Sequence, residues 1–97
     1  VRLKPDTYRL SANFPNPFNP TTTIDYALPE AAHVQLVIYD LLGQAIRTMV
    51  NSHHEAGFYA AVWNAADDDN RPVANGLYFY KLSAGHFNSI GKMMLLK

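Results

Sequence analysis

The chain has 97 residues, a length that accommodates one compact domain rather than two. Apolar residues make up 48% of it, which is enough to form a buried core. Basic and acidic residues number eight each, and this balance excludes a nucleic-acid partner held by a general positive field.

No apolar run approaches the roughly 20 residues that cross a bilayer, so no transmembrane segment is expected. Residues 1–5 do not resemble a signal peptide, and we expect any export signal to lie elsewhere. Cysteine is absent, which excludes disulfides, a catalytic thiolate and cysteine-bound zinc.

Short β-branched and aromatic runs separated by Gly, Pro, Asn and Asp predict strands joined by turns. After a linker over residues 1–7, the first expected strand is residues 8–13. Residues 14–20 contain three prolines, which cannot donate ladder hydrogen bonds, so this segment should be an ordered crossover or sheet edge. Further strands are expected over residues 21–28 and 33–40.

Within the last of these runs, alternate apolar residues form the expected core face: Val34, Leu36 and Ile38. Gly43 can adopt a positive φ, so we expect a hairpin that leads into a strand over residues 44–50. A polar connection over residues 51–57 should then precede a strand over residues 58–64, in which Trp63 anchors the core.

Residues 65–72 form an expected solvated loop, because Asp and Asn dominate them. The last two expected strands, residues 77–82 and 87–97, bring the set to seven. Parallel sheets require intervening helices, and none is predicted here. The pattern therefore predicts an all-β fold, a seven-stranded immunoglobulin-like antiparallel β-sandwich.

No residue pattern predicts catalysis, a cofactor or a metal. The four histidines, at positions 33, 53, 54 and 86, lack metal-ligand spacing, and the glycines are scattered singly. No serine has the sequence context of an activated nucleophile. Hard oxygen ligands cluster at Asp67, Asp68, Asp69 and Asn70, where Asp67 and Asp69 could face one cation. A calcium loop also needs a glycine and a distal glutamate, so a turn is favoured.

An exposed aromatic face offers a different function, that of a carbohydrate-binding or adhesive accessory module. Four aromatic residues are candidates for such a face: Tyr8, Phe58, Tyr78 and Tyr80. Aromatic residues at strand alternation more often lie in a core, so this function is the alternative rather than the leading hypothesis.

Several longer motifs occur in a fixed order: NFPNPFNP at residues 13–20, VIYDLLG at 37–43, Trp63, VANGLYFYKL at 73–82 and KMMLLK at 92–97. Together they resemble the type A C-terminal sorting domain of the type IX secretion system, a relative of the immunoglobulin-like domain of flagellar hook-capping proteins. The resemblance covers residues 8–97. Asn64 and Ala65 depart from it, because Asp and Gly are usual there.

The resemblance implies a larger precursor of a Gram-negative bacterium, exported to the periplasm and then carried across the outer membrane. It implies three partners: the outer-membrane secretion machinery, a sortase-like peptidase and an upstream cargo domain in the same chain. The domain itself would be a non-catalytic secretion signal that also attaches its cargo to the cell surface.

The final apolar run would be partly exposed if only one face of its strand were buried. An exposed edge strand at that position would be a natural handle for strand addition by a partner, and a covered strand is equally compatible with the sequence. The hypothetical recognition set has seven residues: Lys81, Lys92, Met93, Met94, Leu95, Leu96 and Lys97.

Overall fold

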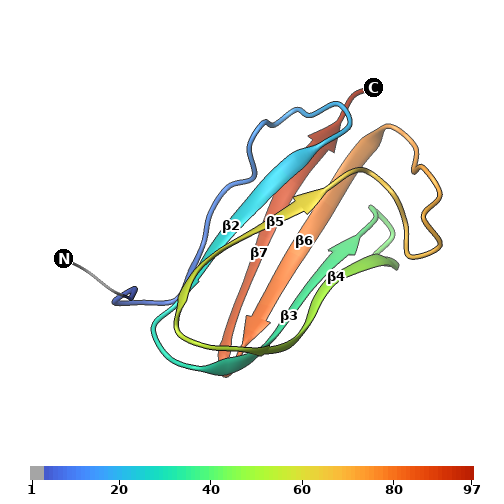
Figure 1. Ribbon diagram of the computed structural model, residues 1–97. Coiled ribbons are helices and arrows are strands. Elements are labelled where there is room, and N and C mark those ends of the chain that lie inside the picture. Colours follow the sequence, from blue (N-terminus) through green and yellow to red (C-terminus); the bar gives the residue numbers. More distant parts are fainter. Residues whose placement is uncertain (1–3) are drawn as a thin grey trace.

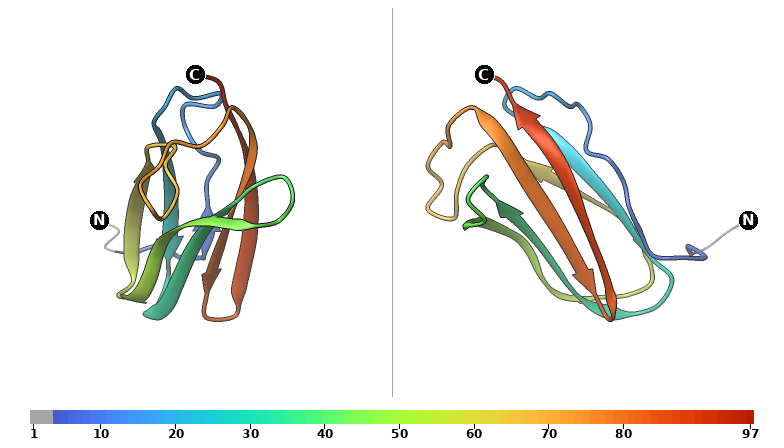
Figure 2. Two further views of the ribbon diagram at one scale, coloured as in Figure 1. Left: turned by 90° about the vertical axis from the view of Figure 1, so that its right-hand side faces the viewer. Right: turned by 180° about the vertical axis from the view of Figure 1, so that it is seen from behind.

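The computed structural model describes residues 4–97 as a sandwich of two antiparallel sheets (Figure 1). The strands are β1 (Arg9–Leu10), β2 (Thr22–Leu28), β3 (Ala32–Tyr39), β4 (Ala45–His54), β5 (Gly57–Trp63), β6 (Gly76–Ala84) and β7 (Phe87–Leu95). One sheet has the order β1-β2-β5 and the other β4-β3-β6-β7, and Figure 2 shows the two layers. The predicted seven-stranded antiparallel β-sandwich is therefore confirmed.

No helix within residues 4–97 has the length and apolarity needed to cross a membrane. Residues 1–3 of the predicted linker lie outside the described range, and the boundary of that linker stays a prediction. Pro5, near its end, is buried.

Alternation along the strands builds the core between the sheets. The predicted core residues Val34, Leu36 and Ile38 are fully buried, which confirms that face of β3. Trp63 is 1% exposed, and its Nε1–H donates to the carbonyl of Ala66 at 2.9 Å. The other large fully buried side chains come mainly from β2, β6 and β7: Ile24, Leu28, Tyr80, Leu82, Met93 and Leu95.

All seven strands differ from their predicted ranges by at least one residue at one end or both, and β1 and β4 differ the most. β1 has only two residues, and β7 ends at Leu95. β4 continues to His54, through residues predicted to form a polar connection. Its polar side chains find polar partners across the strand pair: Asn51 Oδ1 lies 2.7 Å from His33 Nε2. A solvent-facing edge strand tolerates such residues, so polarity did not mark the end of the strand.

The proline-rich segment 14–20 is an ordered crossover between the sheets, as predicted. At its start Phe14 pairs with Thr23 of β2. At its end the backbone N–H of Phe18 donates to the carbonyl of Met94 in β7, and Phe18 accepts from Leu96, both at 3.0 Å. The Phe18 ring is buried against Trp63, at a centroid distance of 5.7 Å.

Candidate recognition surface

Four of the seven predicted recognition residues lie on β7, and the structure places them on its two opposite faces. Met93 and Leu95 are 1% and 0% exposed and belong to the core. Lys92 and Met94 point to the outer face of the four-stranded sheet, because successive side chains of a strand alternate. Of these four side chains, only Lys92 and Met94 are accessible on the folded domain.

β7 is an edge strand, but the outer edge of its C-terminal end is covered. The N–H of Met94 donates to Asn16 Oδ1 at 3.0 Å, and its carbonyl accepts from Phe18. Leu96 donates to the carbonyl of Phe18. Of the two positions that the sequence left open for this run, the structure shows the covered one. Strand addition at residues 94–96 would have to displace the crossover.

Lys97 lies away from the other two lysines of the recognition set. Its backbone N–H donates to Asn75 Oδ1 at 2.9 Å, and its Nζ donates to the carbonyl of Val73 at 2.6 Å. Leu96 is exposed beside it. Lys97 therefore fastens the end of the described chain to the segment that leads into β6.

Lys81 and Lys92 share the outer face of β6 and β7. In the strand register Phe79 lies opposite Lys92, and Lys81 lies opposite Ile90. Among residues 4–97 neither ammonium group forms an ion pair. We call this surface the lysine face and define it by Phe79, Lys81, Ile90, Lys92 and Met94.

A hollow of about 500 Å³ lies between the lysine face and the β3–β4 hairpin. From the sheet it is lined by Phe79, Lys81 and Ile90, and from the hairpin by Tyr39, Asp40, Leu41 and Gly43. Figure 2 shows this hairpin projecting beyond the sheet. The hollow is mainly apolar and is lined by one ammonium group, that of Lys81, and one carboxylate, that of Asp40, so it suits an apolar segment.

The sequence DLLG at residues 40–43 holds two leucines outward at the hairpin tip. Asp40 Oδ1 accepts the N–H groups of Leu42 and Gln44, each at 2.9 Å, and Gly43 has a φ of 83°. Leu41 and Leu42 are 68% and 84% exposed. These leucines were missed as site residues, although two leucines within a turn that the core does not need were a usable signal.

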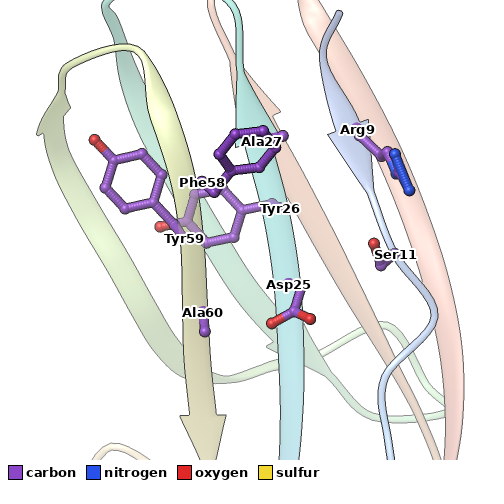
Figure 3. Close-up of a pocket in the computed structure, with 8 residues that line it drawn as sticks. All are labelled: Arg9, Ser11, Asp25, Tyr26, Ala27, Phe58, Tyr59 and Ala60. Atoms are coloured by element: carbon purple, nitrogen blue, oxygen red, sulfur yellow. The ribbon is translucent and has the colours of Figure 1, made fainter. Parts of the chain in front are cut away.

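The four aromatic candidates for a sugar platform do not form one. Tyr78 and Tyr80 are buried in the core, and Tyr8 stacks on Phe87 at a centroid distance of 5.1 Å. Phe58 is exposed, on the outer face of the three-stranded sheet. Figure 3 shows its ring beside Ala27, above a hollow of about 380 Å³ that Arg9 and Asp25 also line.

The acidic loop is organised by its own hydrogen bonds. Asp67 Oδ1 accepts the backbone N–H groups of Asp69 and Arg71, each at 2.9 Å. Asp68 caps the edge of β4, because its carboxylate accepts the N–H of Thr48 and its own N–H donates to Ile46. The favoured turn is what the structure shows. No group of three metal-ligating side chains is found within the described range.

The histidines are also spread over different neighbours. His33 contacts Asn51, His53 contacts Glu55, His54 contacts Tyr26, and the ring of His86 lies 6.0 Å from that of Tyr8. His54 Nδ1 also lies 3.5 Å from Ser52 Oγ, but its Nε2 contacts the Tyr26 hydroxyl rather than the orienting acid that an activated serine needs.

Replacing Asp67 with asparagine should show how much the negative charge of its carboxylate stabilises this loop. The backbone N–H of Arg71 is the main cause that lowers the pKa of Asp67 below 3.8, with the Asp69 N–H and the Arg71 charge adding to it against partial desolvation. Because the pKa of Asp67 is lower in the folded domain than in the unfolded chain, its ionised carboxylate stabilises the fold above pH 3.8. This stabilisation is lost as the pH falls through the pKa of the folded state.

Thermal unfolding of Asp67→Asn, followed by circular dichroism, should show a lower melting temperature than the native chain at neutral pH. The gap should narrow below pH 3.8 and close in stronger acid. Asp25→Asn is the matched control, since Asp25 lies on the exposed face of β2. A gap that stays constant across the titration would contradict this assignment.

Comparison with known proteins places the fold. The FlgD Ig-like domain family matches residues 18–86. Among solved structures, dimeric latent PorU from Porphyromonas gingivalis has a TM-score of 0.73 at 18% identity, over 97% of this chain and 10% of that one. PorZ, described as an essential bacterial surface component of the type IX secretion system of the same organism, has a TM-score of 0.60 at 21% identity, over 95% and 12%.

The chain thus spans about one tenth of the length of these two solved proteins. At such identities the likeness shows a common fold. No curated protein matches the chain. The matched family covers most of the sandwich, and the immunoglobulin-like character predicted from the strand pattern is confirmed. The chain belongs to the FlgD Ig-like domain family.

Proposed function

We propose that this domain is a non-catalytic sorting and surface-attachment module, the type A C-terminal sorting domain of a larger protein exported by the type IX secretion system. The observation that carries the proposal is the fold match over 95% of the chain to a 12% segment of PorZ, itself a surface component of that system. The motifs described above support the same function, because they resemble sorting domains in order and spacing.

The proposal places the protein at the surface of a Gram-negative bacterium, after passage through the periplasm and across the outer membrane. Its partners are then the secretion machinery, a sortase-like peptidase and the upstream cargo of the same precursor. The shape of the domain fits this role, because its conspicuous exposed features are docking surfaces rather than a pocket that holds catalytic groups.

Within this function, the lysine face together with Leu41 and Leu42 is the recognition surface. It offers an apolar hollow, two ammonium groups that form no ion pair within residues 4–97, and a projecting pair of leucines. A partner that docks there would bury the leucines and neutralise Lys81 and Lys92. Apolar side chains that are exposed together on one face are typical of protein contacts, and charged groups beside them belong to the polar rim of such contacts.

Deleting residues 92–97 would be a poor test of recognition. The deletion removes Met93 and Leu95 from the core and opens the contacts that Phe18 makes with β7. Loss of delivery would then follow from unfolding alone. Reversing the charges of Lys92, which is exposed, and Lys81, which is half-buried on the outer face, separates recognition from stability. Surface substitutions usually change the free energy of unfolding by less than about 0.5 kcal/mol.

The experiment fuses residues 1–97 behind an exported reporter in a host with the type IX pathway and measures reporter accessible on intact cells. The native fusion should reach the surface, and the same fusion should not do so in a host that lacks the machinery. Lys81→Glu with Lys92→Glu should weaken recognition by about tenfold, the effect of losing two exposed charge contacts of up to about 1 kcal/mol each.

Lys4→Glu with Arg9→Glu is the matched control, because it changes net charge equally at exposed positions outside the lysine face. That variant should be delivered normally, and both double variants should unfold near the native temperature. A native fusion retained in the periplasm would refute the sorting function. Normal delivery of the Lys81 and Lys92 variant would refute the lysine face alone.

A further inference from the structure

Two sheets have four edges, and three of them are short, irregular or partly hydrogen-bonded within residues 4–97. β1 is only two residues long. The outer edge of β7 is hydrogen-bonded to Asn16 and Phe18 at its C-terminal end. That of β4 is hydrogen-bonded to Asp68 near its start, and its pairing with β3 has two register shifts. Natural sheets close long regular edges because unpaired N–H and C=O groups recruit further strands. The remaining edge belongs to β5.

The edge of β5 is regular and carries none of the usual protection. β5 pairs with β2 at seven consecutive positions without a bulge. Its sequence, GFYAAVW, contains no charged residue and no proline. Within residues 4–97 no backbone hydrogen bond joins its outer side. A strand of this kind is a template for another strand.

The backbone groups on that outer side follow from the pairing of β2. Thr23 exchanges hydrogen bonds with Phe14, and the carbonyl of Asp25 accepts from Ser11, so these two residues turn their backbone groups away from β5. Hydrogen-bonding direction alternates along an antiparallel strand. The alternate residues Thr22, Ile24 and Tyr26 of β2 therefore bond to β5. Their partners there are Trp63, Ala61 and Tyr59.

The intervening residues of β5 direct their N–H and C=O groups to the open side: Phe58, Ala60 and Val62. We propose that these residues pair with the same strand of a second copy of this chain, antiparallel about a two-fold axis at Ala60. Ala60 then faces Ala60 of the partner subunit, and Phe58 faces Val62 of the partner subunit. Each of the three pairs exchanges two hydrogen bonds.

The side chains at these positions favour a second copy as the occupant. Phe58 and Val62 are 65% and 59% exposed. The two-fold axis places Phe58 beside Val62 of the partner subunit, and a cross-strand pair of an aromatic and a β-branched residue stabilises a sheet. β5 brings no charge to the contact. The nearest carboxylate on the face, Asp25, pairs with Ala60 and would lie about 14 Å from its copy, beyond the screening length of about 8 Å.

The two-fold contact also closes on itself. It converts two three-stranded sheets into one six-stranded sheet and leaves short β1 strands at both ends, so it does not propagate into fibres. The interface is one strand wide and belongs with weak contacts that bury less than about 1,200 Å². The association should therefore be concentration-dependent.

Sedimentation of the purified 97-residue chain from about 10 µM to about 1 mM, the range of small interfaces, tests the pairing. The native chain should shift from monomer toward dimer. Ala60→Lys should remain monomeric, because the axis places two ammonium groups side by side. Asn88→Lys, a matched change on the exposed face of β7, should associate like the native chain.

A mixture of Ala60→Lys and Ala60→Glu should associate more strongly than either variant alone, because opposite charges then meet at the axis. This result depends on the proposed register and not only on β5. A native chain that stays monomeric at the highest concentration would overturn the proposal. So would an Ala60→Lys variant that associates normally, or a mixture that shows no gain.

Discussion

Trp63→Ala should lower the free energy of unfolding by about 3–5 kcal/mol, the range measured for large aromatic deletions in cores. Trp63 is almost completely buried, and its ring contacts those of Phe18 and Tyr78 at centroid distances of 5.7 and 5.4 Å. The substitution leaves a cavity between the two sheets. It also leaves the carbonyl of Ala66 without its indole donor. A domain of this size has only about 5–15 kcal/mol to lose.

Urea unfolding followed by far-ultraviolet circular dichroism is the suitable measurement, because Trp63 is the only tryptophan and its removal abolishes the fluorescence signal. Trp63→Phe should be milder, since most of the volume remains while the hydrogen bond is lost. Val62→Ala, one position away and exposed, is the matched control and should change stability little. If Trp63→Ala costs no more than Val62→Ala, Trp63 is not the anchor of this core.

The core could be predicted from the sequence because the alternation is local. A strand with a period of two places its apolar set on one side, so Val34, Leu36 and Ile38 and the burial of Trp63 followed from the pattern alone. The hairpin at Gly43 was equally local, and its φ of 83° fits the expected turn. These features depend on neighbours within a few residues.

The cover over β7 could not be predicted in this way. It depends on Asn16 and Phe18 reaching a strand more than 70 residues later, and alternation says nothing about such pairing. The predicted end of β4 was wrong for a related reason, because Asn51 is polar and yet pairs with β3. A polar composition predicts that a segment is exposed to solvent. Because loops and the outer side of an edge strand are both exposed, it does not predict which of the two a segment forms.

The recognition set was half predictable. Lys92 and Met94 alternate along the strand with Met93 and Leu95. The pattern therefore predicted that the two pairs lie on opposite faces, but not which face is buried. Only the register showed that Lys81 and Lys92 share a face and that the β3–β4 hairpin borders it. The exposed leucines of that hairpin needed the turn geometry of Asp40.

Gly91→Ala should destabilise the domain by about 3–5 kcal/mol, the sum of overpacking at about 1–3 and of two strained hydrogen bonds at roughly 1 each. Gly91 lies opposite Tyr80 in the β6–β7 pair, on the core face. A Cβ there would overlap the end of the Tyr80 ring. The hydroxyl of that ring accepts the N–H of Asn13 and donates to the carbonyl of Ser11, both at 3.0 Å, so it cannot swing aside without releasing the N-terminal segment.

A double-mutant cycle with Tyr80→Leu measures whether this overlap is the cause. In the Tyr80→Leu background the ring is gone, so Gly91→Ala should be nearly neutral, or slightly stabilising because alanine suits a strand better than glycine. Gly57→Ala is the control, since a Cβ there meets the Tyr59 ring at 3.6 Å, an ordinary contact. Additive effects at positions 80 and 91 would contradict the steric explanation. Strong coupling would show that Gly91 is present because Tyr80 fills the space where its side chain would be.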